Sequence, residues 1–317
     1  MLIKMFGALV AATLCSMVVV GCGDGGAPGG DSDAGAPDGS VPDGSVPDGG
    51  VPDGGIPPGP SLVVDTDWLE ENLGSPDVQL VDTRTTGYDD SRIPGAILLR
   101  PSQLATTVDG VPAQAVPATR AQAVLRATGL RNDAIAVVYG APPEYNAARI
   151  AWSLRYYGHP EVRYLDGGYI AWVDSGGAVD TDLPMVEPTE YTIVSVEEDL
   201  RVTGDWVLME IGEPPYDMPA IQLVDARSEE EYGEGRIPTA RSVNWGRNLD
   251  EGFLRPDPEL EALYDGMDYS VTTVAYCVSG WRGSFAWLTL TNLGYQDVRL
   301  YDGSWNEWGN GEFPVEE

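Results

Sequence analysis

The chain has 317 residues, and its 50 acidic side chains outnumber 18 basic ones, which gives a formal net charge of -32 at pH 7. Such an excess of negative charge repels phosphate backbones and anionic lipid headgroups, so the composition excludes a nucleic-acid-binding protein and membrane association through surface charge. A single histidine is too few for a typical metal site or for a Cys–His catalytic pair, so no metal is expected.

Residues 1–21 are typical of a signal peptide, because Lys4 precedes an apolar run that is short for a membrane-spanning helix. The run ends in Val19-Val20-Gly21-Cys22, which resembles the lipobox at which bacterial lipoprotein precursors are cleaved. The resemblance predicts that Cys22 becomes the lipid-modified N-terminus and that Cys15 is removed. A signal peptide without lipidation is the alternative.

A lipid on Cys22 would anchor the protein in the bacterial cell envelope. Gly23 follows the cysteine where an Asp would suggest retention at the inner membrane, so the outer membrane or the periplasmic face is favoured. A multiply acylated cysteine is a stable anchor, whereas a single acyl chain is a weak one.

Residues 22–60 consist largely of Val-Pro-Asp-Gly repeats, such as Val41–Ser45 and Val46–Gly50. So few apolar side chains cannot offset the entropy that ordering would cost, and the pattern predicts a disordered tether. A flexible chain of this length spans roughly 35 Å on average. The tether would hold a folded body clear of a lipid surface.

From residue 61 onwards, one pattern occurs twice. Three motifs recur in the same order: Leu80–Arg84 and Leu223–Arg227, Arg92–Ala96 and Arg236–Ala240, Leu165–Trp172 and Tyr301–Trp308. The repeat predicts two copies of one domain, residues 61–185 and residues 186–317. A segment rich in Gly, Pro and acids, Asp174–Thr189, is the expected linker.

Each copy alternates short β-branched runs with stretches of helical periodicity. In the first copy the pattern predicts strands at Gln79–Asp82, Ala134–Tyr139 and Val162–Leu165, and helices at Thr119–Thr128 and Asn146–Tyr157. This alternation predicts an α/β fold in which a mainly parallel sheet is flanked by helices. His159, the only histidine, precedes a strand and is expected in a turn or on the surface.

The only cysteine after the tether, Cys277, lies at a predicted strand-to-helix turn. The β-branched run Val271–Tyr276 precedes it, and apolar residues at helical spacing follow until Gly294. In a parallel sheet, such turns lie at the carboxyl ends of strands, where binding sites form. Backbone N–H groups at a helix start, together with Arg282, would stabilise a nucleophilic thiolate. A buried structural thiol is the alternative.

The Cys-x-x-Gly-x-Arg pattern that begins at Cys277, together with Tyr301–Trp308, resembles the active domain of a rhodanese-type sulfurtransferase. Leu223–Arg227, Tyr232 and Arg236–Ala240 are similar to the first strand of that family and the loop after it. The resemblance covers nearly all of the chain after residue 60. It implies tandem rhodanese-like domains of the thiosulfate/3-mercaptopyruvate sulfurtransferase family.

The resemblance also implies a reaction. Cys277 would take the sulfane sulfur of a small anionic donor such as thiosulfate, carry it as a persulfide and pass it to a thiol or to cyanide, without a metal or organic cofactor. Arg227 and Arg247 are candidate substrate-binding residues, and for Arg227 a local ion pair with Asp225 is the alternative. The residues expected to hold the persulfide are Val278, Ser279, Gly280, Trp281, Arg282 and Gly283.

The first copy has no comparable nucleophile. Tyr139–Asn146 stands where the second copy has Tyr276–Arg282, with no cysteine, no matching arginine and about two additional residues. Two-domain members of the family have the same arrangement, in which an inactive first domain packs against the catalytic one. The resemblance therefore implies that one domain of each kind is present, and a monomer is expected.

The identity of the sulfur donor is open at this stage. Thiosulfate enzymes of the family often have a basic residue where this chain has Ser279, and both they and 3-mercaptopyruvate enzymes tend to have an arginine where it has Glu231. The mercaptopyruvate type tends to read Cys-Gly-Ser-Gly-Val-Thr, and here Trp281 and Arg282 replace the last two residues. Thiosulfate is preferred; 3-mercaptopyruvate, a non-enzymatic sulfur or selenium carrier and a lipid-anchored interaction module are the alternatives.

Overall fold

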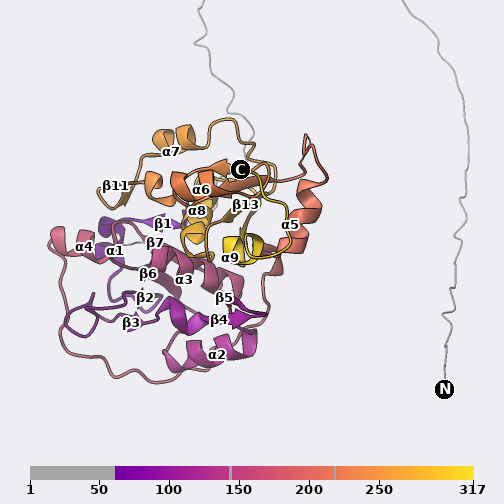
Figure 1. Cartoon of the computed structure of the whole chain (residues 1–317). Helices are drawn as coiled ribbons and strands as arrows, with labels where there is room; N and C mark the ends of the chain where they lie inside the picture. Colours follow the sequence, from indigo (N-terminus) through magenta and orange to yellow (C-terminus); the bar gives the residue numbers. More distant parts are fainter. Residues whose placement is uncertain (1–60, 143–144, 218) are drawn as a thin grey trace, which may run out of the picture. The chain divides into compact units, whose positions relative to one another are not determined.

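The computed structural model describes residues 61–142, 145–217 and 219–317, all of which belong to one compact unit (Figure 1). The predicted signal peptide, the lipidation site Cys22 and the tether up to residue 60 lie outside the described residues. Within the described part of the chain, every helix is too short or too polar to cross a membrane.

Two five-stranded sheets have the same topology. The first has the order β1 (Val63–Val64), β7 (Val162–Leu165), β6 (Ile135–Tyr139), β2 (Val78–Asp82) and β3 (Ile97–Leu98). The second, read from its other edge, has the order β8 (Arg201–Val202), β14 (Val298–Tyr301), β13 (Thr273–Tyr276), β9 (Gln222–Asp225) and β10 (Arg241–Ser242). All pairings within both sheets are parallel. The predicted α/β fold and its duplication are confirmed.

Helices and short hairpins complete each half. The first half has α1 (Thr66–Asn72), η1 (Pro101–Leu104), the hairpin β4 (Ala105–Val108) and β5 (Val111–Ala115), α2 (Ala118–Ala127), α3 (Tyr145–Tyr156) and α4 (Gly168–Asp174). The second half has η2 (Glu198–Leu200), α5 (Gly204–Ile211), α6 (Glu229–Glu234), η3 (Trp245–Asn248), the hairpin β11 (Leu249–Asp250) and β12 (Phe253–Leu254), α7 (Asp257–Leu263), α8 (Trp281–Asn292) and α9 (Ser304–Trp308). Each predicted element of the first half agrees with the structure to within one residue.

The central strand β13 shows why the sequence pattern was informative. All four of its residues, from Thr273 to Tyr276, are buried. A strand whose two faces are both covered by helices buries alternate side chains on both sides, so it reads as an uninterrupted apolar or β-branched run. The strand carries the chain directly to Cys277 at the carboxyl edge of the sheet.

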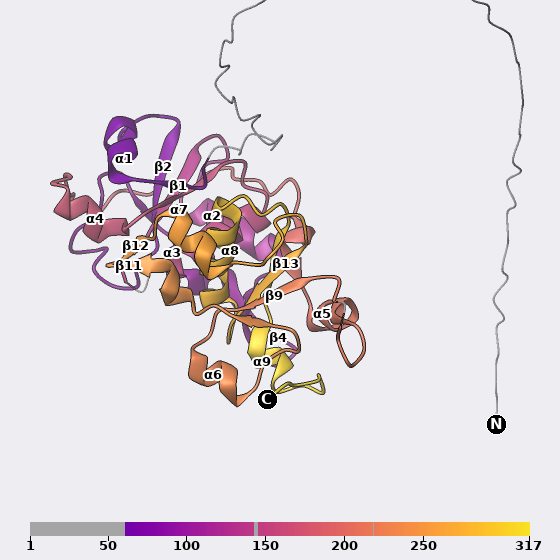
Figure 2. The ribbon, with the colours of Figure 1, turned by 90° about the horizontal axis from the view of Figure 1, so that it is seen from above.

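The two halves share one hydrophobic core, in which α3 and α8 lie side by side (Figures 1 and 2). Each half also holds the hairpin of the other. The N–H of Ala115 in β5 donates to Asp302 Oδ2 at 2.7 Å, and the N–H of Leu254 in β12 donates to Asp166 Oδ1 at 2.9 Å. Equivalent acids after β14 and β7 therefore tie the halves together by the same contact in both directions.

The segment between the halves stays on the first half beyond the predicted boundary at residue 185. The N–H of Thr189 donates to the carbonyl of Arg126, and the N–H of Glu197 donates to the carbonyl of Tyr156. The chain enters the second sheet only at β8. These contacts arise because the segment runs along α2 and the end of α3. The Gly- and Pro-rich composition of the predicted linker did not indicate this packing. The predicted domain boundaries themselves stay predictions.

His159 lies in the turn after α3, as predicted, but its side chain is buried rather than at the surface. Its side chain is 3% exposed and stacks on Tyr191, with 5.8 Å between ring centroids. Nδ1 lies 3.1 Å from the Tyr191 hydroxyl, and Nε2 lies 3.1 Å from the carbonyl oxygen of Ala134. The imidazole is buried because the segment that contains Tyr191 folds back over the turn after α3.

Candidate active site

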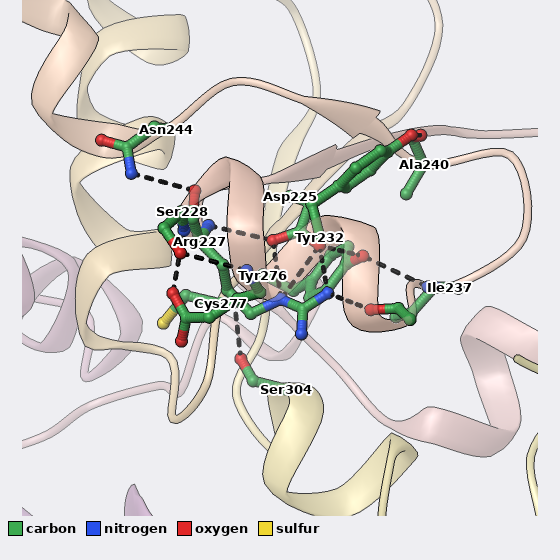
Figure 3. Close-up of polar contacts among 12 residues, drawn as sticks. Asp225, Arg227, Ser228, Tyr232, Ile237, Ala240, Asn244, Tyr276, Cys277 and Ser304 are labelled. Atoms are coloured by element: carbon green, nitrogen blue, oxygen red, sulfur yellow. Dashed lines mark hydrogen bonds and ion pairs between the residues drawn. The ribbon is translucent and has the colours of Figure 1, made fainter. Parts of the chain in front are cut away.

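Cys277 lies at the carboxyl end of β13, and its side chain is 1% exposed. Sγ accepts a hydrogen bond from the N–H of Ser279 at 3.4 Å. The N–H of Cys277 donates to Ser304 Oγ at 3.2 Å, a contact that joins the loop to the start of α9 (Figure 3). The N–H of Trp305 donates to the carbonyl of Cys277 at 3.0 Å. The sulfur is thus held between a tight loop and the strand end rather than in the apolar core alone.

The loop after Cys277 requires glycine at position 280. Gly280 has φ +77° and immediately precedes α8. A Cβ at this position would lie 3.0 Å from both Arg149 Nη1 and Asp302 Oδ1, so a larger residue would meet both backbone strain and a crowded ion pair. The N–H of Asn306 donates to the carbonyl of Val278 at 2.9 Å and closes the other side of the loop. The expected strand-to-helix turn is confirmed.

Arg282, in the first turn of α8, forms a two-pronged ion pair with Glu231 of α6. Nη1 lies 2.7 Å from Oε2, and Nη2 lies 2.8 Å from Oε1. These hydrogen bonds lower the pKa of Glu231 to about 2. They also raise the pKa of Arg282, to which the neighbouring Cys277 side chain contributes. The guanidinium is therefore bound to the Glu231 carboxylate and close enough to Cys277 to interact with it electrostatically.

Arg227 is in the local ion pair that the sequence left open as its alternative role. Its guanidinium, 2% exposed, donates from Nε to Asp225 Oδ1 at 3.0 Å and from Nη2 to the carbonyl of Gly235 at 2.6 Å (Figure 3). Tyr276 donates its hydroxyl to Asp225 Oδ2 at 2.6 Å. The guanidinium also lies over the Trp305 ring, 4.2 Å from its centroid. This cluster joins β9, β13 and α9, and a substrate-binding role for Arg227 stays a prediction.

The remaining candidates lie around the loop. Arg247 is exposed on η3, and within the described residues its side chain makes no hydrogen bond or ion pair. Trp281 is half-buried in the first turn of α8, and its Nε1 has no partner in the described part of the chain. Gly283 is buried and closely surrounded, since a Cβ added there would lie 3.1 Å from Leu300 Cδ1. Residues 61–317, apart from the three undescribed positions, contain no group of three or more His, Cys, Asp or Glu side chains that could hold a metal.

Comparison with known families identifies this architecture. The model of the rhodanese-like domain matches residues 65–175 and residues 204–310, so each match lies inside one of the two predicted domains. The chain belongs to the rhodanese family. Its second rhodanese domain contains Cys277, and its first contains the loop without a cysteine.

Relatives of this rhodanese extend over most of its length. It is 33% identical over 273 residues to the sulfur carrier protein TtuD of Thermus thermophilus, covering 79% of this chain and 94% of the relative. It is 34% identical over 278 residues to a Mycobacterium tuberculosis protein provisionally named thiosulfate sulfurtransferase SseA, covering 79% and 89%. The crystal structure of the 3-mercaptopyruvate sulfotransferase SseA from Escherichia coli matches with a TM-score of 0.70 at 26% identity, covering 78% of this chain and all of that one.

The first rhodanese domain differs from the second at the corresponding loop. Gly140 follows Tyr139 where Cys277 follows Tyr276. The first domain therefore has no thiol at this place in the fold.

Sequence reasoning missed Arg149, which the first rhodanese domain places against the loop of the second. Its guanidinium is 1% exposed and donates from Nη1 to Asp302 Oδ1 at 2.7 Å. Arg201 Nε lies 3.3 Å from the other Asp302 oxygen. A charged residue within the otherwise apolar inner face of α3 was the only signal in the sequence. Arg149 and Asp302 together form the wall against which Gly280 packs.

Proposed function

We propose that this rhodanese is a sulfurtransferase that moves sulfane sulfur from thiosulfate to a thiol or cyanide through a persulfide on Cys277. The observation that carries the proposal is the position of Cys277, whose sulfur accepts a hydrogen bond from the N–H of Ser279 in the loop directly before a 12-residue helix that begins with Trp281 and Arg282. Helix N-termini and cations stabilise anionic sulfur. Both the thiolate and the persulfide need this stabilisation.

The reaction proceeds by two displacements. The Cys277 thiolate attacks the outer sulfur of thiosulfate, a new S–S bond forms, and sulfite leaves with the electron pair of the bond that breaks. An acceptor thiolate or cyanide then attacks the terminal sulfur of the persulfide, and the Cys277 thiolate is the leaving group. The N–H of Ser279, which donates to Sγ, would stabilise the negative charge of the persulfide, together with the other N–H groups between Val278 and Gly283.

The comparisons support 3-mercaptopyruvate as the donor equally well, because the chain is similar to the E. coli 3-mercaptopyruvate sulfotransferase SseA. The name of TtuD supports the related proposal of a sulfur carrier, which would load Cys277 and deliver to a protein partner with poor turnover on small acceptors. An interaction module would function without the thiol. Persulfide formation on Cys277 distinguishes the enzyme and the carrier from the interaction module. Turnover with small acceptors distinguishes the enzyme from the carrier.

We further propose that the protein is a monomeric lipoprotein of the bacterial cell envelope, anchored through Cys22. The support is the Val19-Val20-Gly21-Cys22 pattern and the repeat-rich tether after it. The enzyme body would then act on small sulfur compounds at the periplasmic side of a membrane.

Intact mass spectrometry of the purified protein after incubation with thiosulfate tests the proposed reaction. We expect a gain of one sulfur atom, removed by cyanide with release of thiocyanate. Cys277→Ser should gain no sulfur. If thiosulfate does not load the wild type, 3-mercaptopyruvate is tested in the same way. A wild type that gains no sulfur from either donor would overturn the sulfurtransferase proposal.

A further inference from the structure

The cation beside the catalytic sulfur is already paired in the free protein. Arg282 uses both terminal nitrogens of its guanidinium to bind the two oxygens of Glu231. Two parallel charge-assisted hydrogen bonds of this kind are stronger and more directional than a single contact. The positive charge of Arg282 is therefore largely compensated by Glu231 before an anionic donor approaches Cys277.

Glu231 is itself held in place by the start of α6. The N–H of Ser228 donates to Oε2 of Glu231 at 2.8 Å, and the N–H of Glu231 donates to Ser228 Oγ at 3.1 Å. This reciprocal pair is a capping box, in which the third helical residue is commonly Glu or Gln. The carboxylate is thus positioned by backbone geometry, independently of any ligand.

The ion pair is accessible from solvent. The side chain of Arg282 is 23% exposed, and that of Glu231 is 32% exposed. Arg227 and Arg149 are also compensated, because Arg227 binds Asp225, and Arg149 binds Asp302, whereas the side chain of Arg247 on η3 is exposed. The surroundings of Cys277 consequently offer less uncompensated positive charge than the arginine count suggests.

We propose that Glu231 shifts the donor preference of the site, by lowering the efficiency with dianionic donors such as thiosulfate relative to that with monoanionic donors such as 3-mercaptopyruvate; thiosulfate remains a donor, but a less efficient one than it would be with an uncharged residue at this position. This inference rests on the proposed sulfur transfer. A second negative charge on the donor is repelled by the Glu231 carboxylate, and it cannot recover this energy from Arg282 unless the ion pair opens. A monoanionic donor is repelled less.

Both donors load the same sulfur. With 3-mercaptopyruvate, the Cys277 thiolate attacks the donor sulfur, and the C–S bond breaks with its electron pair on carbon, which takes up a proton to give pyruvate. The new persulfide keeps the proton of the donor thiol. The two half-reactions differ in the charge of donor and leaving group. The Glu231 carboxylate repels the dianionic donor more strongly than the monoanionic one.

Glu231→Gln tests the proposal, because it removes the charge and keeps both the length of the side chain and its ability to cap α6. We expect the ratio of kcat/KM for thiosulfate to kcat/KM for 3-mercaptopyruvate to rise about two- to fivefold, the range typical of one exposed charge pair. The rise should shrink at high salt, which screens exposed charges. Glu231→Asn is a second uncharged variant and should move the ratio in the same direction.

Glu230→Gln is the matched control, since it removes the same charge from an exposed neighbour on the same helix. Its ratio should stay close to that of the wild type. An unchanged or lower ratio in folded Glu231→Gln, with both donors still loading Cys277, would overturn the role of Glu231 and leave sulfur transfer intact. Failure of the wild type to load sulfur from either donor would instead overturn the proposed function, and this inference with it.

Discussion

The buried His159 side chain couples folding to pH. Both ring nitrogens are within hydrogen-bond distance of buried oxygens, and burial lowers the pKa of the imidazole below its usual value of 6.5. The folded protein therefore binds a proton here less readily than the unfolded chain. Stability that depends on the neutral imidazole is present above pH 6.5 and is lost as the pH falls below that value.

Replacement of His159 by Gln should reduce this pH dependence. The free energy of unfolding of the wild type should decrease between about pH 7.5 and about pH 5.5 by more than that of His159→Gln, because histidine titrates in this range and glutamine does not. Urea unfolding at the two pH values measures the difference. Equal losses in the two proteins would show that the imidazole is protonated as easily in the folded state as in the unfolded one.

At the scale of elements, the loop that contains Cys277 depends on a helix from the other domain. Arg149 of α3 binds Asp302, which follows β14, and both border the Cβ position of Gly280. Since the ion pair is almost completely buried, removal of one partner leaves an incompletely compensated charge in the interior. The rhodanese domain without the cysteine therefore helps to support the loop of the domain that contains Cys277.

We expect Arg149→Met to destabilise the protein by about 3 kcal/mol, the lower range for breaking a buried pair. It should also slow sulfur loading of Cys277, because the loop at Gly280 loses a packing partner. Arg155→Met, on the exposed side of the same helix, is the control and should have little effect on either quantity. Urea unfolding measures the loss of stability, and the time course of persulfide formation measures the rate of sulfur loading. Equal effects of the two substitutions would contradict the role of Arg149.

At the scale of the whole molecule, the proposed membrane association depends on Cys22, outside the described residues. The net charge of -32 makes electrostatic attraction to an anionic membrane unfavourable, so an acyl anchor is the proposed mode of binding.

Expressed in a bacterium, the full chain should fractionate with membranes and resist extraction by high salt, because acyl chains rather than charges hold it there. Cys22→Ser should be released into the soluble fraction. Cys15→Ser, which alters the segment that is cleaved off, should fractionate like the wild type. Immunoblots of the fractions measure the outcome. Wild-type protein in the soluble fraction would contradict the lipoprotein proposal.

The family, the duplication and the cysteine loop could all be predicted from the amino-acid sequence, because each depends on residues that are close together in the chain. The run up to Tyr276 specifies a buried strand, Gly280 allows the turn, and helical spacing follows Trp281. The motif Leu80–Arg84 and its echo Leu223–Arg227 likewise specify equivalent strands and turns in the two halves.

The charges that surround Cys277 were decided by tertiary packing. Glu231 and Arg282 are 51 positions apart, and Arg149 and Asp302 are 153 apart. No local pattern indicates which of many charged side chains will meet, because their pairing depends on how α6 docks on its sheet and how α3 packs against α8. His159 follows the same rule, since its burial depends on a later segment that folds back over it. Strands, turns and helices depend on residues that are close together in the chain. The pairing of charges and the burial of polar side chains depend instead on how distant elements pack against one another.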